Sequence, residues 1–229
     1  MNTYELIDEM FGGDVLKQYL AKKQVIEIPN TDRESLADLL SAMDLRVGAE
    51  IGVERGLYSK VLLQHNSKLF LYSIDAWTAY HGYRDHVTQS KMNQLLEDAK
   101  ENLHKYQDRN VLVKKFSVDA AKGFEDGSLD FVYLDGNHEY VQVVNDLGAW
   151  DPKVRIGGIV AGHDYIRRKH NGYLMHVIPA VNGFVDSYQI SPLFILGRKD
   201  RRPGEKRDTA RSWFYIKEER GAVKPGFES

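Results

Sequence analysis

The residues best suited to chemistry lie in two short segments, LDGNHEY at 134–140 and GGIVAGHDY at 157–165. Each segment continues an apolar run that is typical of a buried strand, 129–134 in the first case and 156–161 in the second. In a parallel sheet the carboxyl ends of the strands lie at one edge, where ligands bind. We therefore expect the side chains that follow these two strands to converge, namely Asp135, His138, His163 and Asp164.

This group carries the oxygen and nitrogen donors of a site for a divalent ion such as Mg²⁺ or Mn²⁺. We expect Asp135, His163 and Asp164 to hold the ion, which would lower the pKa of a substrate hydroxyl. His138 is placed to remove the proton, so His138 and Asp135 are the expected catalytic residues. Alternatives stay open, because His138 could only orient a ligand, His163 could be an ordinary loop histidine, and Asn137 could be an outer ligand.

A glycine loop, EIGVERG at 50–56, joins an apolar strand at 47–52 to a helix expected at 57–64. Glycines let a ligand approach the backbone, and the helix N-terminus offers free N–H groups. The next strand, 68–74, ends at Asp75, where an acid can accept hydrogen bonds from both hydroxyls of a ribose. Glu50 suits a cationic ligand group better than a pyrophosphate, and no G-K-[ST] phosphate loop is present. The alternative is a structural turn with Asp75 as an ordinary loop residue.

Four motifs occur in order: EIGVxxGxxS at 50–59, IDxW at 74–77, DGNHxY at 135–140 and GGIxxGHDY at 157–165. At these residues the sequence resembles a small bacterial family of class I S-adenosylmethionine-dependent methyltransferases, over about residues 46–166. The resemblance implies a cofactor site built from Glu50, Gly52, Gly56, Ser59, Asp75, Ala76, Trp77, Ser117, Val118 and Asp135.

The resemblance also implies individual roles. Glu50 would lie near the amino group of the cofactor, Asp75 would hold the ribose, and Ser117 would sit at the adenine. Metal-dependent O-methyltransferases of this class carry Asp at the end of the fourth strand, Lys three residues later, and Asp-Asn after the fifth strand. This sequence differs in three of those side chains, which leaves open the metal requirement, the metal and the base. The implied reaction is O-methylation of a small molecule such as a sugar or natural product.

Strands and helices alternate along the chain, which predicts a doubly wound, mostly parallel α/β sheet. Beyond the strands above we expect one at 111–115, and a C-terminal antiparallel hairpin from the β-rich runs 187–196 and 212–217. Helices are expected at 31–43, 91–106, 141–150 and 176–184, with a short one beginning at 120. We expect one domain over 1–229, a seven-stranded Rossmann-like core at 44–229 with an N-terminal helical region at 1–43. That region could also pack on a second subunit in a homodimer.

Composition narrows the function further. The 229 residues include no cysteine, which excludes thiolate zinc sites, and 31 Lys+Arg against 33 Asp+Glu disfavour a globally basic nucleic-acid binder. No apolar run could span a membrane and no signal peptide is evident, so we expect a cytoplasmic protein.

Segments 77–90 and 165–173 are candidate lids over the acceptor. Two alternatives are a nucleic-acid methyltransferase, suggested only by the basic run 198–211, and a non-catalytic S-adenosylmethionine-binding domain.

Overall fold

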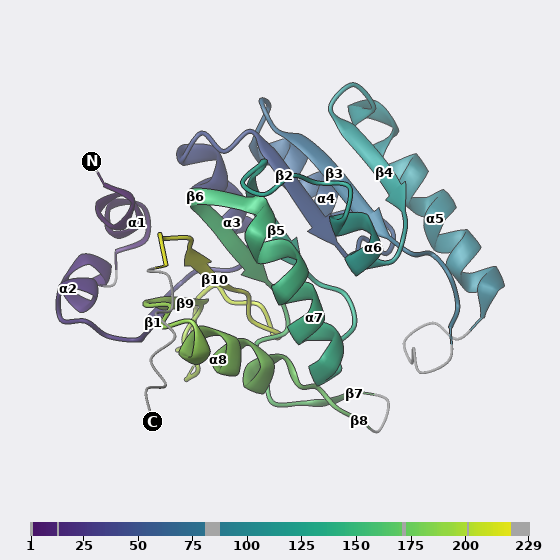
Figure 1. Ribbon diagram of the computed structural model, residues 1–229. Coiled ribbons are helices and arrows are strands. Elements are labelled where there is room, and N and C mark those ends of the chain that lie inside the picture. The colour runs from purple at the N-terminus through teal and green to yellow at the C-terminus, as the bar shows by residue number, and fades with distance from the viewer. Residues whose placement is uncertain (1, 13, 81–87, 171–172, 201, 221–229) are drawn as a thin grey trace, which may run out of the picture.

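An eight-stranded sheet forms the centre of the computed structural model, which describes residues 2–12, 14–80, 88–170, 173–200 and 202–220 (Figure 1). The strand order is β1-β9-β10-β6-β5-β2-β3-β4. The bounds are β1 (Val25–Ile28), β2 (Val47–Ile51), β3 (Phe70–Asp75), β4 (Asn110–Lys114), β5 (Leu129–Leu134), β6 (Val154–Gly162), β9 (Leu193–Leu196) and β10 (Trp213–Ile216). A separate ribbon pairs β7 (Lys169–His170) with β8 (Tyr173–Leu174).

The sheet is mostly parallel, and its exception is β10. This strand runs antiparallel to both β6 and β9, which confirms the expected C-terminal antiparallel hairpin. The remaining neighbours pair in parallel, including β2 with β3 and with β5. The doubly wound α/β fold predicted from the alternation of strands and helices is therefore confirmed.

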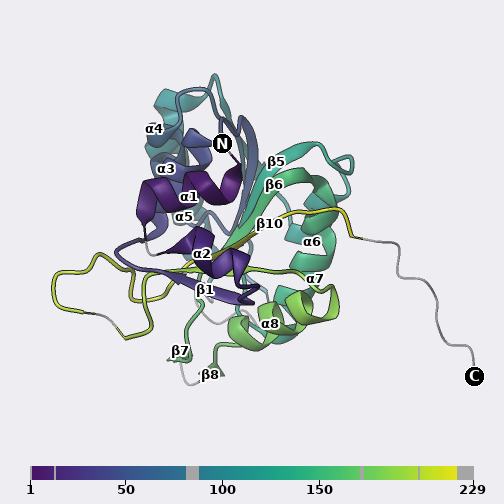
Figure 2. The same ribbon diagram turned by 90° about the vertical axis from the view of Figure 1, so that its left-hand side faces the viewer.

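Helices cover both faces of the sheet (Figure 2). The first face carries α1 (Thr3–Phe11), α2 (Val15–Leu20), α3 (Arg33–Ala42), α4 (Leu57–His65) and α5 (Gln89–Leu103). The second face carries α6 (Ser117–Ala121), α7 (Tyr140–Trp150) and α8 (Val177–Ser187), and two short 3₁₀ turns are η1 (His104–Tyr106) and η2 (Asp151–Lys153). Ile7 and Val15 are fully buried in the same cluster as Phe131 of the sheet, so the N-terminal helices pack on the core.

The N-terminal region contributes a strand that the sequence did not predict. β1 lies within residues 1–43 and pairs in parallel with β9, which gives eight strands instead of the expected seven. Its four residues, VIEI, are too few for a clear periodic signal, although Ile26 and Ile28 are fully buried. Because β1 is parallel to the central strands, the residues that follow it, including the start of α3, lie at the carboxyl edge.

The start of α3 is fixed by a capping box. Asp32 is the N-cap and exchanges hydrogen bonds with Ser35. Thr31 donates its hydroxyl to the carbonyl of Ile28 at 2.7 Å. This arrangement fixes the turn between β1 and α3.

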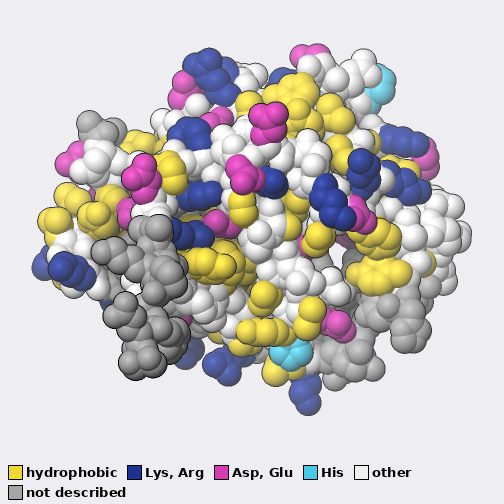
Figure 3. All heavy atoms as spheres, in the orientation of Figure 1, with side chains coloured by type: hydrophobic (Ala, Val, Ile, Leu, Met, Phe, Trp, Pro, Cys, Tyr) yellow, Lys and Arg dark blue, Asp and Glu magenta, His cyan; other side chains and the backbone are white. Residues whose placement is uncertain are grey.

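The basic run at 198–211 is tied to the rest of the chain. Arg211 lies 2.5 Å from a carboxylate oxygen of Glu27, and Lys206 lies 3.0 Å from Asp32. Arg207 donates to two backbone carbonyls. On the face shown in Figure 3, Lys and Arg side chains are interspersed with Asp and Glu. Two cations of this run, Arg211 and Lys206, are therefore paired with acids from the N-terminal part of the chain. Among the described helices, none is long and apolar enough to cross a bilayer.

Candidate functional site

The loops that follow β2 and β5 meet at the carboxyl edge, where the strand order reverses. The amide of Asp135 donates to the carbonyl of Ile51 at 2.7 Å. Gly52 has φ +90°, and a Cβ there would lie 2.1 Å from the carbonyl oxygen of Asp135. Only glycine fits this contact, so the loop requires Gly52 for both its conformation and its packing.

Asp75 ends β3 beside this loop. Its carboxylate accepts the backbone N–H of Glu54 at 3.0 Å and that of Trp77 at 2.8 Å. Burial raises the pKa of Asp75, and these backbone hydrogen bonds oppose the rise. The side chain is thus held by backbone groups at a fixed place in the wall of a cavity.

That cavity has a volume of about 250 Å³ and runs along the carboxyl ends of β2, β3 and β5. Six of the cofactor residues expected from the sequence line it, namely Gly52, Asp75, Ala76, Ser117, Val118 and Asp135. The wall also includes Thr78 and Tyr80 from the expected lid at 77–90, and residues that the sequence did not indicate, among them Lys115, Phe116, Gln142 and Asp146. The space is concave, mixed polar and apolar, and placed where this fold binds ligands.

Glu50, also expected at the cofactor, is turned inward with 2% of its surface exposed and does not line the cavity. It accepts a hydrogen bond from the Ser59 hydroxyl. Ser59 accepts in turn from Ser73 at 3.0 Å, and Ser73 accepts from Asn110 at 2.8 Å. Burial raises the pKa of Glu50 to about 8, although the bond from Ser59 opposes the rise. A cation reaching this carboxylate would compensate for its burial.

The structure corrects the expected place of Trp77. This side chain is fully buried, donates its Nε1–H to the carbonyl of Glu54 at 2.8 Å, and packs with Met92 and Leu95. It does not line the cavity, because the loop after β3 turns it into the core beneath the floor.

Ser59 and Gly56, also expected at the cofactor, do not line the cavity either. Gly56 is the N-cap of α4 with φ +78°, and a Cβ there would lie 2.9 Å from Leu103. Both residues shape the loop and do not face the cavity.

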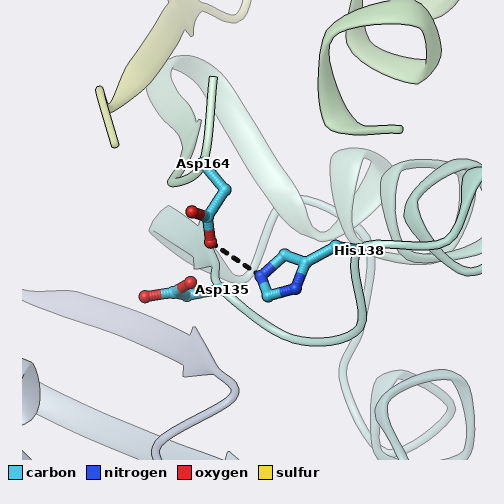
Figure 4. A group of neighbouring side chains, drawn as sticks. All are labelled: Asp135, His138 and Asp164. Carbon is cyan, nitrogen blue, oxygen red and sulfur yellow. Dashed lines mark ion pairs between the residues drawn. The ribbon is translucent and has the colours of Figure 1, made fainter. Parts of the chain in front are cut away.

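Asp135, His138 and Asp164 form the tightest group of potential metal ligands (Figure 4). One donor atom from each lies within 4.8 Å of the others. Nε2 of His138 is 2.7 Å from Oδ2 of Asp164, and Figure 4 shows both side chains turned toward Asp135. The convergence expected from the two strand ends therefore occurs.

His163 lies against the same carboxylates. Its Nδ1 is 3.5 Å from Asp164 and 3.7 Å from Asp135. Its Nε2 is buried and has no hydrogen-bond partner within the described part of the chain. Burial raises the pKa of Asp135 to about 6. Burial acts in the same direction on Asp164, but hydrogen bonds from His138 and His163 hold its pKa well below the usual range.

Asp146 is a functional candidate that the sequence analysis did not single out. It lines the cavity from α7, and its Oδ1 accepts from the Ser117 hydroxyl at 2.5 Å. The indole of Trp150 donates to that hydroxyl at 2.9 Å. Burial raises the pKa of Asp146 to about 6. The available signal was an acid on the face of α7 that also carries Val143 and Leu147.

The two expected lids fall partly outside the description. Residues 81–87 of the first and 171–172 of the second are not among those that the structure describes. Within the first lid, Tyr80 lines the cavity, accepts from Asn137 at 3.0 Å, and meets Phe116 edge to face at 5.5 Å. The rings of Tyr80 and Phe116 therefore both belong to the wall of the cavity, on the side of Asn137.

Comparisons with known proteins complete the description of the site. A family model described as a methyltransferase domain matches residues 49–165, whereas no curated protein matches the sequence. An O-methyltransferase from Bacillus cereus in complex with SAH is 14% identical with a TM-score of 0.58, over 93% of this chain and 91% of that one. The N-methyltransferase NodS from Bradyrhizobium japonicum WM9 is 12% identical with a TM-score of 0.54, over 82% and 95%.

An O-methyltransferase family protein from Burkholderia thailandensis is 14% identical with a TM-score of 0.53. The match covers 81% of this chain, and this chain spans 59% of that protein. At such identities the likeness shows a common fold and does not identify the methyl acceptor, since names with O- and N-methylation both occur.

Proposed function

Since the chain belongs to the methyltransferase domain family, we propose that it transfers a methyl group from S-adenosylmethionine to an oxygen of a small molecule with the help of a divalent cation. The observation that carries this proposal is the position of Asp135. Its side chain belongs to the cavity wall and also to the group with His138 and Asp164. The proposed cofactor cavity and the proposed metal ligands therefore share one residue.

The cavity suits S-adenosylmethionine, which supplies, when bound, an electrophilic methyl group on a sulfonium. Gly52 lets a ligand reach the backbone, and Asp75 offers its carboxylate to ribose hydroxyls. Glu50 would face the α-ammonium group, whose positive charge favours the ionised form of this buried carboxylate. Ser117 and Val118, at the start of α6, would contact the adenine. These contacts would align the methyl group with the acceptor.

The carboxylate and histidine group suits Mg²⁺ or Mn²⁺. Asp135 and Asp164 would supply oxygens, and His163 would complete the set with an imidazole nitrogen. The nitrogen of His163 that faces both carboxylates is Nδ1, so this is the atom that would bind the cation. A cation here would lower the pKa of an acceptor hydroxyl.

His138 would remove the proton from that hydroxyl. Its side chain is 23% exposed, against 14% for His163, so it is the histidine better able to reach an acceptor. The contact with Asp164 orients the imidazole and favours its protonated form after proton transfer. Nε2 of His138, which faces Asp164, could instead bind the cation, because His138 belongs to the group of potential metal ligands with Asp135 and Asp164.

Calorimetry and metal titration test the proposal. We expect micromolar binding of S-adenosylhomocysteine (SAH) and no comparable binding of NAD; tighter binding of NAD would refute the assignment of the cofactor. Electron paramagnetic resonance measures the binding of Mn²⁺, which we expect for the wild type. His163→Ala should weaken Mn²⁺ binding, whereas His138→Ala should leave it within threefold. The reverse pattern would make His138 the ligand and remove it as the base.

A further inference from the structure

Arg33 is a charged residue at the carboxyl edge of the sheet, where the negative charges of Asp208 and Asp135 raise its pKa. It is the first residue of α3 and is partly buried. Its guanidinium carbon lies 5.4 Å from the centre of the Tyr58 ring. Within the described residues the guanidinium makes no ion pair or side-chain hydrogen bond. The carboxylate of Asp208 accepts a hydrogen bond from the backbone N–H of Arg33 at 2.9 Å and does not bond to its guanidinium.

The neighbours of Arg33 place it beside the cofactor loop. The Tyr58 hydroxyl donates to the carbonyl of Arg33 at 2.9 Å, so α3 and α4 are joined at this edge. The rings of Tyr58 and Tyr133 are 4.4 Å apart. Tyr133 is the register partner of Glu50, and residues paired in neighbouring strands point to the same face. Arg33 and Glu50 therefore lie on the same face of the sheet, and Asp135 follows two residues after Tyr133.

The local charge keeps the guanidinium ionised. Burial acts to lower the pKa of Arg33, but the oxygens of Tyr133 and Asp208 around it raise that pKa on balance. A partly buried charge without a hydrogen-bonded counter-ion is unfavourable unless a ligand supplies one. Arginine is also the side chain whose fork geometry best matches a carboxylate.

We propose that Arg33 binds the carboxylate of the methionine part of the cofactor, a positioning role that rests on the proposed function. Glu50 and Arg33 then form a complementary pair, in which the acid receives the α-ammonium group and the guanidinium receives the α-carboxylate. The two opposite charges would fix the direction in which the amino-acid part of the cofactor enters. A carboxylate on the methyl acceptor is the other source of the same chemistry, and the experiment separates the two.

The experiment compares two ligands that differ only in the carboxylate. Calorimetry measures the affinity of SAH and of its decarboxylated analogue, S-adenosyl-3-thiopropylamine, for the wild type and for Arg33→Met, Arg33→Lys and Arg155→Met. Methionine preserves the packing on Tyr58, and lysine preserves the charge. Arg155 is the matched control, because this arginine already has an ionic partner, Asp130, at 2.6 Å. Asp130 accepts a backbone N–H at the start of β2, so the pair lies at the edge of the sheet opposite the cavity.

We expect Arg33→Met to weaken SAH binding about 10- to 100-fold, as for loss of a charge-assisted hydrogen bond, and to leave the analogue within twofold. Arg33→Lys should recover part of the loss, and Arg155→Met should bind both ligands like the wild type. An unchanged affinity of Arg33→Met for SAH would overturn the inference and exclude the cofactor as the source of the carboxylate. An equal loss for both ligands would overturn it in favour of a structural role. If the wild type itself fails to bind SAH, the proposed function fails first.

Discussion

The two halves of the site are built in different ways. In the cofactor half, backbone groups hold the key side chains: Asp75 accepts two backbone N–H groups, and Gly52 packs on the carbonyl of Asp135. In the other half, side chains hold one another: Asp135, His138 and Asp164 each place a donor atom within 4.8 Å of the others, and His138 lies 2.7 Å from Asp164. The first half is formed before any ligand arrives. The second is arranged so that a cation could replace protons.

The two halves should therefore respond separately to mutation. A change in one half should alter the binding of one ligand and spare the other, even though Asp135 lies in both.

The strongest test is Asp164→Asn. Loss of a carboxylate ligand should weaken Mn²⁺ binding about 100-fold or more, because metal affinity depends on ligand charge and geometry. Affinity for SAH should stay within twofold of the wild type. The matched control is Asp126→Asn, at an exposed aspartate paired with Lys153, which should change neither value. A comparable loss of SAH affinity in Asp164→Asn would show that the halves are not separable.

The reciprocal test is Asp75→Asn. The amide oxygen can still accept one of the two backbone N–H groups, whereas the NH2 group cannot accept the other, and the charge that strengthens bonds from ribose hydroxyls is lost. We expect SAH affinity to fall about 10- to 100-fold, as for loss of a charge-assisted hydrogen bond, with unchanged Mn²⁺ affinity. Calorimetry with each ligand provides the measurement. An unaltered affinity for SAH would remove Asp75 from the ribose site.

The pH dependence of SAH binding tests the proposed contact between Glu50 and the α-ammonium group. Its pKa in the free protein is about 8, raised by burial, and the α-ammonium group favours the ionised carboxylate. Below pH 8 a proton must therefore leave when SAH binds, and affinity should rise about tenfold per pH unit between 6.5 and 7.5. Glu50→Gln should bind more weakly and lose most of this slope. A flat profile for the wild type would contradict the contact.

Glu50 also links pH to stability. Its folded pKa is raised above the usual value for glutamate, so the folded state binds more protons at neutral pH and wild-type stability declines as pH rises toward 8. Glu50→Gln should lack this decline, so its thermal midpoint should gain on the wild type between pH 6 and 8.5. Unchanged relative midpoints would mean that Glu50 ionises freely in the fold.

The smallest expected effect concerns a residue outside both halves. Lys206 is 47% exposed and lies 3.0 Å from Asp32. Lys206→Gln should lower the free energy of unfolding by less than about 1 kcal/mol, because exposed ion pairs contribute little. Binding of SAH and Mn²⁺ should not change. A marked loss of either would show that the basic run 198–211 acts on the site.

The sequence was most informative where a short segment determines geometry. The loop at 50–56 and Asp75 could be located because glycine conformations and the end of a strand are local properties. Asp135 and Asp164 are far apart in the chain, yet their convergence followed from the rule that parallel strands end at one edge.

Other features depended on packing that no local pattern records. The direction of Trp77 is set by the turn after β3, which places the ring in the core. Asp146 lines the cavity from α7, and Arg33 lies at the carboxyl edge at the start of α3, on the opposite face of the sheet. No local sequence pattern distinguishes either from an ordinary polar residue of a helix. Strand β1 has only four residues, and its partner β9 lies more than 160 positions later in the chain.

The most direct test of the whole account is a crystal structure of the protein with SAH and Mn²⁺, using the anomalous signal of manganese. We predict SAH in the cavity with its ribose hydroxyls on Asp75, and a manganese peak within coordination distance of Asp135 and Asp164. SAH bound away from the loop at 50–56, or manganese bound away from these two carboxylates, would contradict the account.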